Sequence, residues 1–277
     1  MTIIGVVISY YPDTESFIKN IDRYADLLDE LVVWENTPEQ DSLVDAHLFV
    51  EKSYADKIRI WGEGDNKGIS QVLNKVVDYA LQNEYRYLLT MDQDSRWENF
   101  DFFINKIRML DIVNIAQYTP ELNQIRLRND QLRFVDYKIT SGSVFDLLLI
   151  QQVGKFREDF SVDGIDLDYG YRITGKGLQI VEIGEALLTQ QFGKKIKLFH
   201  KKEWSSYSAQ RLYDIVRTHL ILFRDYYPRS MQMLKDLVLI YYIKYPLLIL
   251  LSDNQKGDKL RAIWKGTIAG IKYRCKR

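Results

Sequence analysis

Runs of apolar residues alternate with stretches of helical spacing through the first half of the chain. Residues 3–9 form a continuous apolar run, as expected for a strand that is buried on both faces. Pro12-Asp13-Thr14 is typical of a helix start. After it, apolar side chains recur at helical spacing over 17–28. The same two patterns predict further strands at 31–34, 57–61, 85–91 and 111–118, and helices at 69–80 and 99–110. This alternation predicts an α/β fold with a mostly parallel sheet and helices on both faces.

The second half of the chain is less regular. Strands are expected at 134–140 and 178–183, and a short helix at 162–174. The small residues Ser141-Gly142-Ser143 predict a loop after the first of these strands. A long helical pattern covers 206–226, and the remainder is predicted to be helical, first apolar and then basic.

Two carboxylates end the fourth predicted strand. Asp92 and Asp94 are spaced i, i+2, which points both side chains to one face of a strand. Ligands of parallel α/β sheets bind beyond the carboxyl ends of the strands, and paired carboxylates suit a hard divalent cation that holds a diphosphate. The pair therefore suggests nucleotide chemistry. The alternative is an ordinary turn, since Asp also accepts hydrogen bonds from nearby backbone amides.

Polar residues end two other predicted strands, at Ser9-Tyr10 and at Glu35-Asn36-Thr37. Because the carboxyl ends of parallel strands lie at one edge of the sheet, this coincidence favours a functional interpretation of the acidic pair. The loop 64–68 precedes a helix, so its backbone amides could approach an anion, or it could be a plain loop.

A second acidic group lies at Asp163, Asp166 and Asp168, at the predicted start of a helix. One interpretation is a general base, because a carboxylate held rigidly in a pocket can have its pKa tuned for proton abstraction. The other is a helix cap at Asp163 with Asp166 in the first turn, where negative charge favours the helix dipole. Both can hold at once, with Asp163 as the cap and Asp166 as the base.

The charge distribution is asymmetric although the formal net charge of the 277 residues is zero. Residues 256–277 hold eight basic side chains and one acidic side chain, so this segment carries +7 and the remainder −7. Residues 237–251 are strongly apolar but contain Lys244 and Pro246, and they are fewer than the roughly 20 residues that span a bilayer. We expect 237–277 to contact an anionic membrane surface. The alternative is a buried helix or an oligomer contact followed by a solvated tail.

Several classes of protein are disfavoured by composition. The single cysteine, Cys275, can form no internal disulfide, and His47, His200 and His219 lack ligand spacing, so neither structural zinc nor Ser/His/Asp hydrolysis is indicated. The basic tail lies apart from the acidic pair, which disfavours a nucleic-acid partner. The N-terminus lacks a signal-peptide pattern, and the cysteine usage fits a reducing compartment, so we expect a cytoplasmic protein at the inner face of the cell membrane.

The order of these motifs resembles glycosyltransferase family 2, and within it the rhamnosyltransferase-like branch of bacterial polysaccharide assembly. The most specific match is Leu89-Thr90-Met91-Asp92-Gln93-Asp94-Ser95, which is close to the metal motif of that branch. The resemblance covers nearly the whole chain, and its other segments are Val6-Val7-Ile8-Ser9-Tyr10, Val32-Val33-Trp34-Glu35-Asn36-Thr37, Asp65-Asn66-Lys67-Gly68-Ile69-Ser70 with Asn74, Ser141-Gly142-Ser143, Asp166-Leu167-Asp168 through Arg172 with Gly175-Lys176-Gly177, and Arg211-Leu212-Tyr213 through Arg217.

The resemblance implies a GT-A fold over 1–205, with a nucleotide-sugar half at 1–118 and an acceptor half at 119–205, followed by a helical extension at 206–277. Asp94 would be a ligand of Mg²⁺ or Mn²⁺, Asp92 would contact the metal or the donor ribose, and Asp166 would be the catalytic base. The remaining implied site residues are Ser9, Glu35 and Asn66 near the nucleoside, and Ser141, Gly142, Ser143, Asp163 and Asp168 on the acceptor side.

Three positions depart from the family pattern. The usual Asp of the second strand is Glu35, one methylene longer, and the usual Glu before the catalytic Asp is Ile165, where this branch commonly has an apolar residue. The His-x-x-Gly of the family is Gln190-Gln191-Phe192-Gly193 here. If that histidine binds metal in relatives, Gln190 offers only a neutral oxygen in its place.

The function implied by the resemblance is inverting transfer of a sugar from dTDP-rhamnose or a UDP-hexose to a hydroxyl of a glycan or lipid-linked glycan. One rival hypothesis is a sugar-nucleotidyltransferase on a related sheet. It would need a basic triphosphate-binding loop near the N-terminus, which residues 9–16 do not offer. The other is a non-catalytic interaction protein that retains the fold.

Overall fold

The computed structural model describes residues 1–123, 131–160, 163–191, 193–198 and 202–274. Outside the described residues lie Val162, with which the predicted helix over 162–174 begins, and Phe192, His200 and Cys275, as well as the last two basic residues of the tail. By their internal contacts the residues divide into two units. The first unit comprises 1–158 and 169–191, and the second comprises 159–168 and 192–277.

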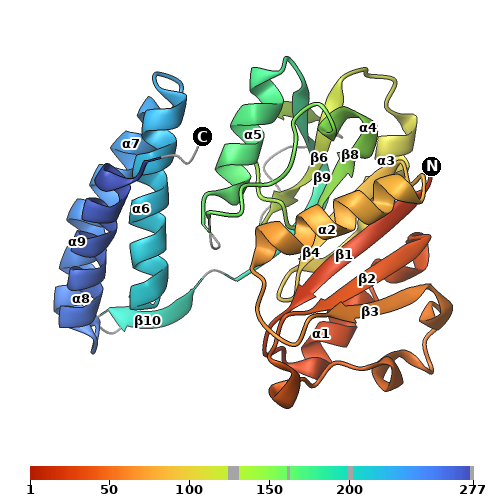
Figure 1. Cartoon of the computed structure of the whole chain (residues 1–277), viewed down its shortest axis with the longest axis horizontal. Helices are drawn as coiled ribbons and strands as arrows, with labels where there is room; N and C mark the ends of the chain where they lie inside the picture. The colour runs from red at the N-terminus through yellow and green to blue at the C-terminus, as the bar shows by residue number, and fades with distance from the viewer. Residues whose placement is uncertain (124–130, 161–162, 192, 199–201, 275–277) are drawn as a thin grey trace. The chain divides into compact units, whose positions relative to one another are not determined.

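The first unit is built on a mixed, mostly parallel sheet (Figure 1). Its strand order is β3-β2-β1-β4-β8-β6-β9-β5, with β7 also paired to β9. Neighbours are parallel from β3 to β4 and between β6 and β9, whereas β8, β5 and β7 pair antiparallel. The strands are β1 (Ile3–Ser9), β2 (Glu30–Glu35), β3 (Ile58–Gly62), β4 (Tyr87–Asp92), β5 (Arg96–Trp97), β6 (Ile115–Leu122), β7 (Leu132–Val135), β8 (Ser143–Asp146) and β9 (Gln179–Thr189).

Helices cover both faces of this sheet, as the alternating pattern predicts. Side chains Ile3 and Val7 of β1 pack with Phe17 of α1 and with Phe100 and Phe103 of α3 in one core cluster. Figure 1 shows α2 across the other, near face of the sheet. The helices are α1 (Thr14–Ile21), α2 (Ile69–Gln82), α3 (Phe100–Met109), α4 (Leu147–Ile150) and α5 (Ile165–Gly175), with single 3₁₀ turns η1 (Ala25–Leu27), η2 (Glu39–Asp41), η3 (Ala46–Phe49) and η4 (Ala55–Lys57).

The predicted elements need correction where local backbone geometry interrupts the apolar pattern. The strand expected from residue 111 begins at Ile115, because Asn114 has a positive φ of 67° and ends the preceding turn. The strand expected over 134–140 ends at Val135, and the one expected over 178–183 continues to Thr189. Ser143, predicted in a loop, begins the short strand β8.

The second unit is mainly helical. Its elements are β10 (Lys194–Leu198), β11 (Lys202–Ser206), α6 (Ala209–Tyr226), α7 (Met231–Leu237), the π-helix η6 (Val238–Lys244), α8 (Tyr245–Ser252) and α9 (Lys256–Lys272). The Ser208 hydroxyl caps α6 by accepting a hydrogen bond from the Arg211 amide. Leu212 and Val216 of α6 pack with Leu237, Ile249 and Ile263 in the core of the unit. Within the described part of the chain, no helix is both long and apolar enough to cross a bilayer.

One basic residue of the tail is internal to this unit. The Lys259 ammonium donates to the carboxylate of Asp253 and to the hydroxyl of Ser206, 2.7 Å away, and all three side chains are buried. Lys259 therefore ties α9 to the ends of α8 and β11 and does not contribute to the surface charge of the tail.

Candidate active site

The acidic pair lies at the carboxyl end of β4, beside the ends of β1 and β2. Asp92 is aligned with Ile8 of β1, and Ser9 is aligned with Glu35 of β2. The structure therefore brings Ser9, Glu35 and Asp92 to one edge of the sheet, where α/β folds bind their ligands.

Gln190 joins this pair from the residue that follows β9. Its Nε2 donates to Oδ2 of Asp92 at 2.8 Å and lies 3.3 Å from Oδ1 of Asp94. Its Oε1 is buried and has no hydrogen-bond partner among the described residues. One amide thus bridges both carboxylates and holds an unsatisfied oxygen next to them. The contact joins positions nearly 100 residues apart in sequence, and it is at this position that the family pattern has a histidine.

The group has the composition of a site for a hard cation. Mg²⁺, Mn²⁺ and Ca²⁺ prefer carboxylate and carbonyl oxygens, which Asp92, Asp94 and the unsatisfied Oε1 of Gln190 supply. Among the described residues, no cluster of three or more His, Cys, Asp or Glu side chains could hold a metal ion. The candidate group consists of two carboxylates and one amide, and these three residues could hold such an ion.

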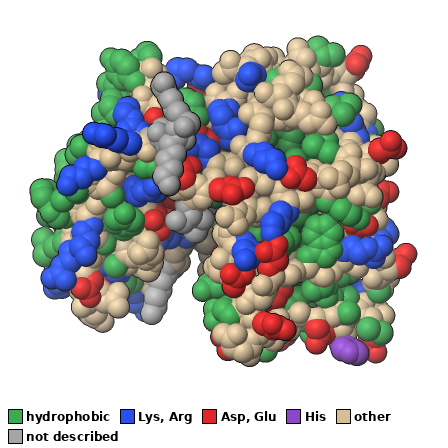
Figure 2. Space-filling view, in the orientation of Figure 1, with side chains coloured by type: hydrophobic (Ala, Val, Ile, Leu, Met, Phe, Trp, Pro, Cys, Tyr) green, Lys and Arg blue, Asp and Glu red, His purple; other side chains and the backbone are tan. Residues whose placement is uncertain are grey.

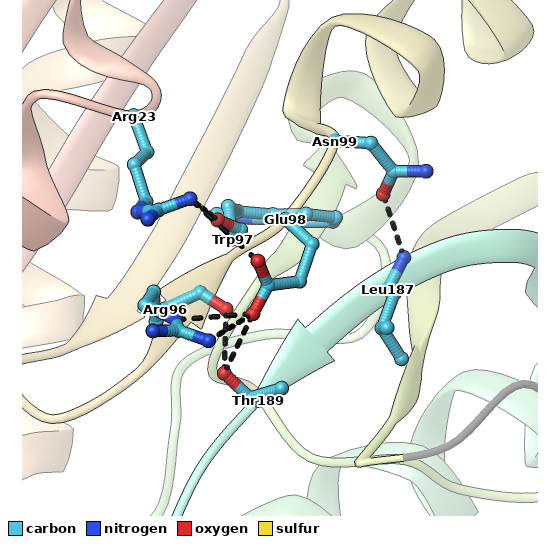
Figure 3. A network of polar contacts seen from close by, with 7 residues as sticks. All are labelled: Arg23, Arg96, Trp97, Glu98, Asn99, Leu187 and Thr189. Atoms are coloured by element: carbon cyan, nitrogen blue, oxygen red, sulfur yellow. Dashed lines mark hydrogen bonds and ion pairs between the residues drawn. The ribbon is translucent and has the colours of Figure 1, made fainter.

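A network of polar contacts fixes the two chain segments that carry this group (Figure 3). The carboxylate of Glu98, just after β5, accepts hydrogen bonds from Nε of Arg96 at 3.0 Å and from the Thr189 hydroxyl at 3.3 Å. Arg23 of the loop after α1 donates to the Trp97 carbonyl at 3.1 Å. These contacts staple β5, which follows the acidic pair, to the end of β9, which precedes Gln190.

Asn99 extends these contacts along β9. Its Nδ2 donates to the Glu185 carbonyl at 2.7 Å, and its Oδ1 accepts from the Leu187 amide at 2.8 Å (Figure 3). Glu185 has a positive φ of 65°, so the strand is irregular at this point. Asn99 satisfies the backbone groups on both sides of that irregularity and so sets the path of β9 toward Gln190.

The serine loop backs the acidic turn. The Asp92 amide donates to Oγ of Ser141 at 2.9 Å, and Ser141 in turn donates to the buried Ser95 hydroxyl at 2.7 Å. The Gly142 amide donates to the Thr90 carbonyl at 2.7 Å. Ser143 is buried in β8, where its hydroxyl meets Gln117. In this structure, Ser141 and Gly142 support the backbone of the acidic turn, and an acceptor contact for any of the three stays a prediction.

Two of the polar residues expected near the nucleoside, Ser9 and Glu35, form hydrogen bonds with β2 and with the loop that follows it. Ser9 is fully buried and its hydroxyl points to the Trp34 carbonyl at 3.4 Å. Both carboxylate oxygens of Glu35 accept hydrogen bonds, from the Thr37 amide at 2.8 Å and from the Ser42 hydroxyl at 3.2 Å. The longer side chain of Glu35 thus reaches back to organise the loop after β2.

Asn66 lies beside this loop. Its Oδ1 accepts hydrogen bonds from Asn36 Nδ2 at 3.0 Å and from the Gly68 amide at 2.8 Å. The Lys67 amide donates to Oδ1 of Asn36 at 2.9 Å. The structure therefore joins the loops after β2 and before α2 through two asparagines.

Two residues that the sequence did not single out complete this edge. Gln93, between the two aspartates, clasps the backbone of Tyr10: its Oε1 accepts from the Tyr10 amide at 2.6 Å and its Nε2 donates to the Tyr10 carbonyl at 3.0 Å. Tyr11 has a positive φ of 46°, and its exposed ring lies edge-on to that of Tyr10 with 4.8 Å between centroids. A single sequence gives no signal for either feature. The contact of Gln93 depends on the pairing of β1 with β4, and Tyr11 is held by the loop after β2, where its amide donates to Oγ1 of Thr37 at 2.9 Å.

The second acidic group lies at the start of α5. Asp163 is not its cap, since the helix begins at Ile165 and the Asp163 carboxylate forms an ion pair with Arg211 of α6, with 3.3 Å between Oδ2 and Nε. Burial raises the pKa of Asp163, and Arg211 opposes that rise. Asp168 is buried and accepts a 2.7 Å hydrogen bond from the Tyr226 hydroxyl. Asp166 is half-buried in the first turn of the helix.

No protein-family model matches the chain. A curated relative, the dTDP-rhamnosyl transferase RfbF of Shigella flexneri, is 22% identical over 299 residues, which cover 98% of this chain and 95% of the relative. Among solved structures, a mannosyltransferase of Pyrobaculum calidifontis in complex with GDP-Man and Mn²⁺ superposes with a TM-score of 0.59 at 14% identity, covering 97% of this chain and 75% of that one. GalNAc-T7 with UDP, GalNAc and Mn²⁺ gives a TM-score of 0.57 at 9% identity, and this chain spans 54% of its length.

The solved structures confirm the predicted GT-A fold, and the curated relative confirms the predicted resemblance to rhamnosyltransferases. At sequence identities of 9% and 14%, these two solved structures support the fold alone. The roles of individual residues follow from the geometry of this chain.

Proposed function

We propose that the chain is an inverting, metal-dependent glycosyltransferase of family 2 that moves a sugar from a nucleotide diphosphate sugar to an acceptor hydroxyl. The observation that carries the proposal is the cluster of Asp92, Asp94 and Gln190 at the carboxyl edge of a GT-A sheet. The curated relative supports a nucleotide-sugar donor, with dTDP-rhamnose or a UDP-hexose as the candidates.

Asp94 and Asp92 would hold Mg²⁺ or Mn²⁺, with Gln190 turning its Oε1 toward the ion. When bound, the ion supplies positive charge that neutralises the leaving diphosphate. The chain's own contribution is preorganisation, because the staple between β5 and β9 fixes both sides of the group before the donor arrives. Neighbouring structures that contain Mn²⁺ support a divalent ion.

The nucleoside would lie over the ends of β1 and β2, against the loops that Glu35 and Asn66 organise. Ser9 is buried beneath these loops, so its role is to shape the floor of this region. Glu35 already satisfies two loop donors, and any contact with the ribose would add to those bonds.

Asp166 is the base of the proposed reaction. It would take the proton of the acceptor hydroxyl as the oxygen attacks the anomeric carbon and the bond to the diphosphate breaks. A single displacement of this kind inverts the anomeric configuration. On the acceptor side, Asp163 and Asp168 support the helix that carries Asp166, and Ser141 and Gly142 support the acidic turn.

A glycan or lipid-linked glycan is the proposed acceptor, because the second unit carries a surface suited to a membrane. Seven apolar side chains of η6 and α8 are exposed, from Val238 to Leu251, with Leu247 56% exposed. On α9, Trp264 and Ile271 are exposed among Arg261, Lys265 and Lys272. Figure 2 shows hydrophobic and basic side chains lying together on the unit that contains α8 and α9. An apolar face beside cations favours the anionic inner surface of the cell membrane.

A thermal-shift screen tests the donor half of this proposal. The unfolding temperature is measured with dTDP-rhamnose, UDP-glucose and UDP-galactose, each with and without Mn²⁺, because a ligand that binds only the native state stabilises it. We expect one donor to raise it only with Mn²⁺, and Asp94→Ala to remove that shift. A donor shift that survives in Asp94→Ala would show the metal assignment to be wrong.

Turnover tests the base. Asp166→Asn should abolish release of the nucleotide diphosphate from the donor while the Mn²⁺-dependent thermal shift remains. Normal turnover by Asp166→Asn rules out this residue as the base. Binding without turnover by the unsubstituted protein favours the non-catalytic alternative.

A further inference from the structure

The segment 159–168, which carries the proposed base, packs within the C-terminal helical unit. It is separated from the rest of that unit by more than 20 residues of chain, so its place is determined by side-chain contacts. Among its described residues, contacts with α6 or with the end of α9 are made by Asp159, Asp163, Gly164 and Asp168.

One face of α6 receives the segment. Arg211, Thr218, Leu222 and Tyr226 are spaced seven, four and four residues apart, which places them along a single stripe of the helix. Arg211 pairs with Asp163, and the Tyr226 hydroxyl donates to Asp168 at 2.7 Å. A neighbouring face of α6 packs in the core of the unit through Leu212 and Val216.

Gly164 lies between these two polar anchors, against the middle of the stripe. A Cβ at Gly164 would lie 2.3 Å from Cγ2 of Thr218 and 3.1 Å from Cδ1 of Leu222, and the φ of Gly164 is +91°. Only glycine allows the backbone to approach α6 this closely in this conformation. The start of α5 therefore lies directly on α6.

The end of α9 holds the other end of the segment. The Tyr273 hydroxyl donates to the Asp159 carboxylate, and Nη1 of Arg217 donates to the Asp159 carbonyl at 3.2 Å. The guanidinium groups of Arg217 and Arg224 lie 5.2 Å and 5.6 Å from the Tyr273 ring centroid, and Arg224 also donates to the Tyr273 carbonyl at 2.7 Å. Tyr273 is thus fixed by α6 while it binds Asp159.

We infer that Arg211, Tyr226 and Tyr273 are positioning residues that orient the first turn of α5, and with it the carboxylate of Asp166. The inference rests on the proposed role of Asp166 as the base. In this inference the C-terminal helices orient the proposed base, in addition to any contact with a membrane. Asp166 lies two residues from Asp168 and three from Asp163, so both anchors act within one turn of it.

The test replaces single hydroxyl groups, so that packing is preserved. Tyr226→Phe, Tyr273→Phe and the double variant each remove a hydrogen bond to the segment. Tyr242→Phe is the matched control, since its hydroxyl bonds Thr267 at 2.6 Å inside the same unit and does not reach the segment. Hydrogen–deuterium exchange of the amides from Gly164 to Asp168 reports on the segment directly, without reference to activity.

We expect the double variant to exchange these amides roughly tenfold faster and to turn over its donor roughly tenfold more slowly, because small misplacements of a catalytic group cost large factors in rate. The probes are dTDP-rhamnose, UDP-glucose and UDP-galactose with Mn²⁺, and donor affinity measured by calorimetry should stay within twofold. A merely structural role would leave kcat per folded molecule at the level of Tyr242→Phe, and that result would overturn the inference.

Asp166→Asn separates this inference from the proposed function. If Asp166→Asn is inactive but the tyrosine variants match the control in exchange and turnover, the positioning role is wrong and the base stands. If Asp166→Asn turns over its donor normally, the base is wrong and the positioning role falls with it.

Discussion

Nε2 of Gln190 lies 2.8 Å from Oδ2 of Asp92, so a neutral amide occupies the space between the two carboxylates of the acidic pair. The amide donates hydrogen bonds to negative groups, and its oxygen faces no described partner. Rotation of the amide by half a turn would exchange the donor for an acceptor and present three oxygens to a cation. The same amide could therefore donate to the two carboxylates or join them in facing a cation.

Replacing this amide with a carboxylate should make the unfolding temperature more sensitive to metal. In Gln190→Glu, three like charges meet without an intervening donor, which we expect to cost about 1 kcal/mol and to lower the unfolding temperature by roughly 2–4 °C. Mn²⁺ should reverse the loss and give a larger upward shift than in the unsubstituted protein, because a third anionic oxygen strengthens binding of a hard cation. Thermal unfolding with Mn²⁺ and with a chelator measures both effects.

Gln191→Glu is the control for this change, since the neighbouring side chain is exposed and adds the same charge. It should alter neither the unfolding temperature nor the response to Mn²⁺. An equal response of the two variants would show that Gln190 does not face the metal.

Loss of the Asn99 side chain should loosen the staple on β9. Asn99→Ala leaves the Glu185 carbonyl and the Leu187 amide without their side-chain partner, which we expect to cost about 2 kcal/mol in the free energy of unfolding. Urea unfolding measures the loss. Asn83→Ala, which removes one exposed hydrogen bond to Tyr79, should cost less than about 0.5 kcal/mol. Similar losses in the two variants would contradict a special role of Asn99.

Stability should fall as the medium becomes mildly acidic, because burial lowers the pKa of His219. The folded protein keeps this imidazole neutral, with Nδ1 next to the Ile215 carbonyl, while the unfolded chain takes up a proton near pH 6.5. The free energy of unfolding therefore declines as pH falls through 6.5.

The His219 contribution is isolated by comparison with His219→Gln, whose amide can also donate to the Ile215 carbonyl but does not titrate. Urea unfolding at both pH values should show a smaller decline for the variant. Asp163 acts in the opposite sense, since its raised pKa makes acid favour the folded state, and its contribution is present in both proteins. Equal declines would show that His219 is protonated equally in the folded and unfolded chain.

Membrane contact should require both the apolar and the cationic side chains of the second unit. Flotation with vesicles that contain anionic lipid should recover the unsubstituted protein, and Leu247→Gln with Leu250→Gln should reduce recovery. Arg261→Gln with Lys265→Gln should weaken binding by about 1 kcal/mol per charge and reduce its dependence on salt. Leu43→Gln is the control, because Leu43 is 62% exposed in the first unit. Unchanged recovery of both double variants would exclude this surface.

The parts of the fold that could be predicted from sequence are those in which one local pattern dominates. The strands β1, β2 and β4 are continuous apolar runs, and α2 has an apolar face at helical spacing, so their positions follow from burial alone. The strand β8 could not be predicted, because its four residues follow a serine-rich loop and it is stabilised by pairing with β4 and β6.

The candidate site divides in the same way. The sequence predicted two carboxylates at the end of β4, but only Asp92 lies in the strand. Asp94 lies two residues further along, in a turn, so its direction does not follow from the alternation of a strand. The contact of Gln190 with that pair depends on the irregular path of β9 through Glu185, which no sequence spacing encodes. The engagement of Asp163 with Arg211 likewise depends on tertiary packing, which overrode its local tendency to cap a helix.

The second unit is formed by two separate stretches of the chain, 159–168 and 192–277, and this limits which segments can be exchanged with a homologue. Residues 159–168 contain the three residues that contact the stripe of α6. Asp163 contacts Arg211, Gly164 contacts Thr218, and Asp168 contacts Tyr226, although more than 20 residues of chain separate this segment from the rest of the unit. A chimaera that exchanges only 192–277 with a homologue would place a foreign α6 against a native segment. A chimaera with one crossover point before residue 159, one after residue 168 and one before residue 192 would exchange the segment together with α6. The stripe of α6 would then keep the segment that it contacts.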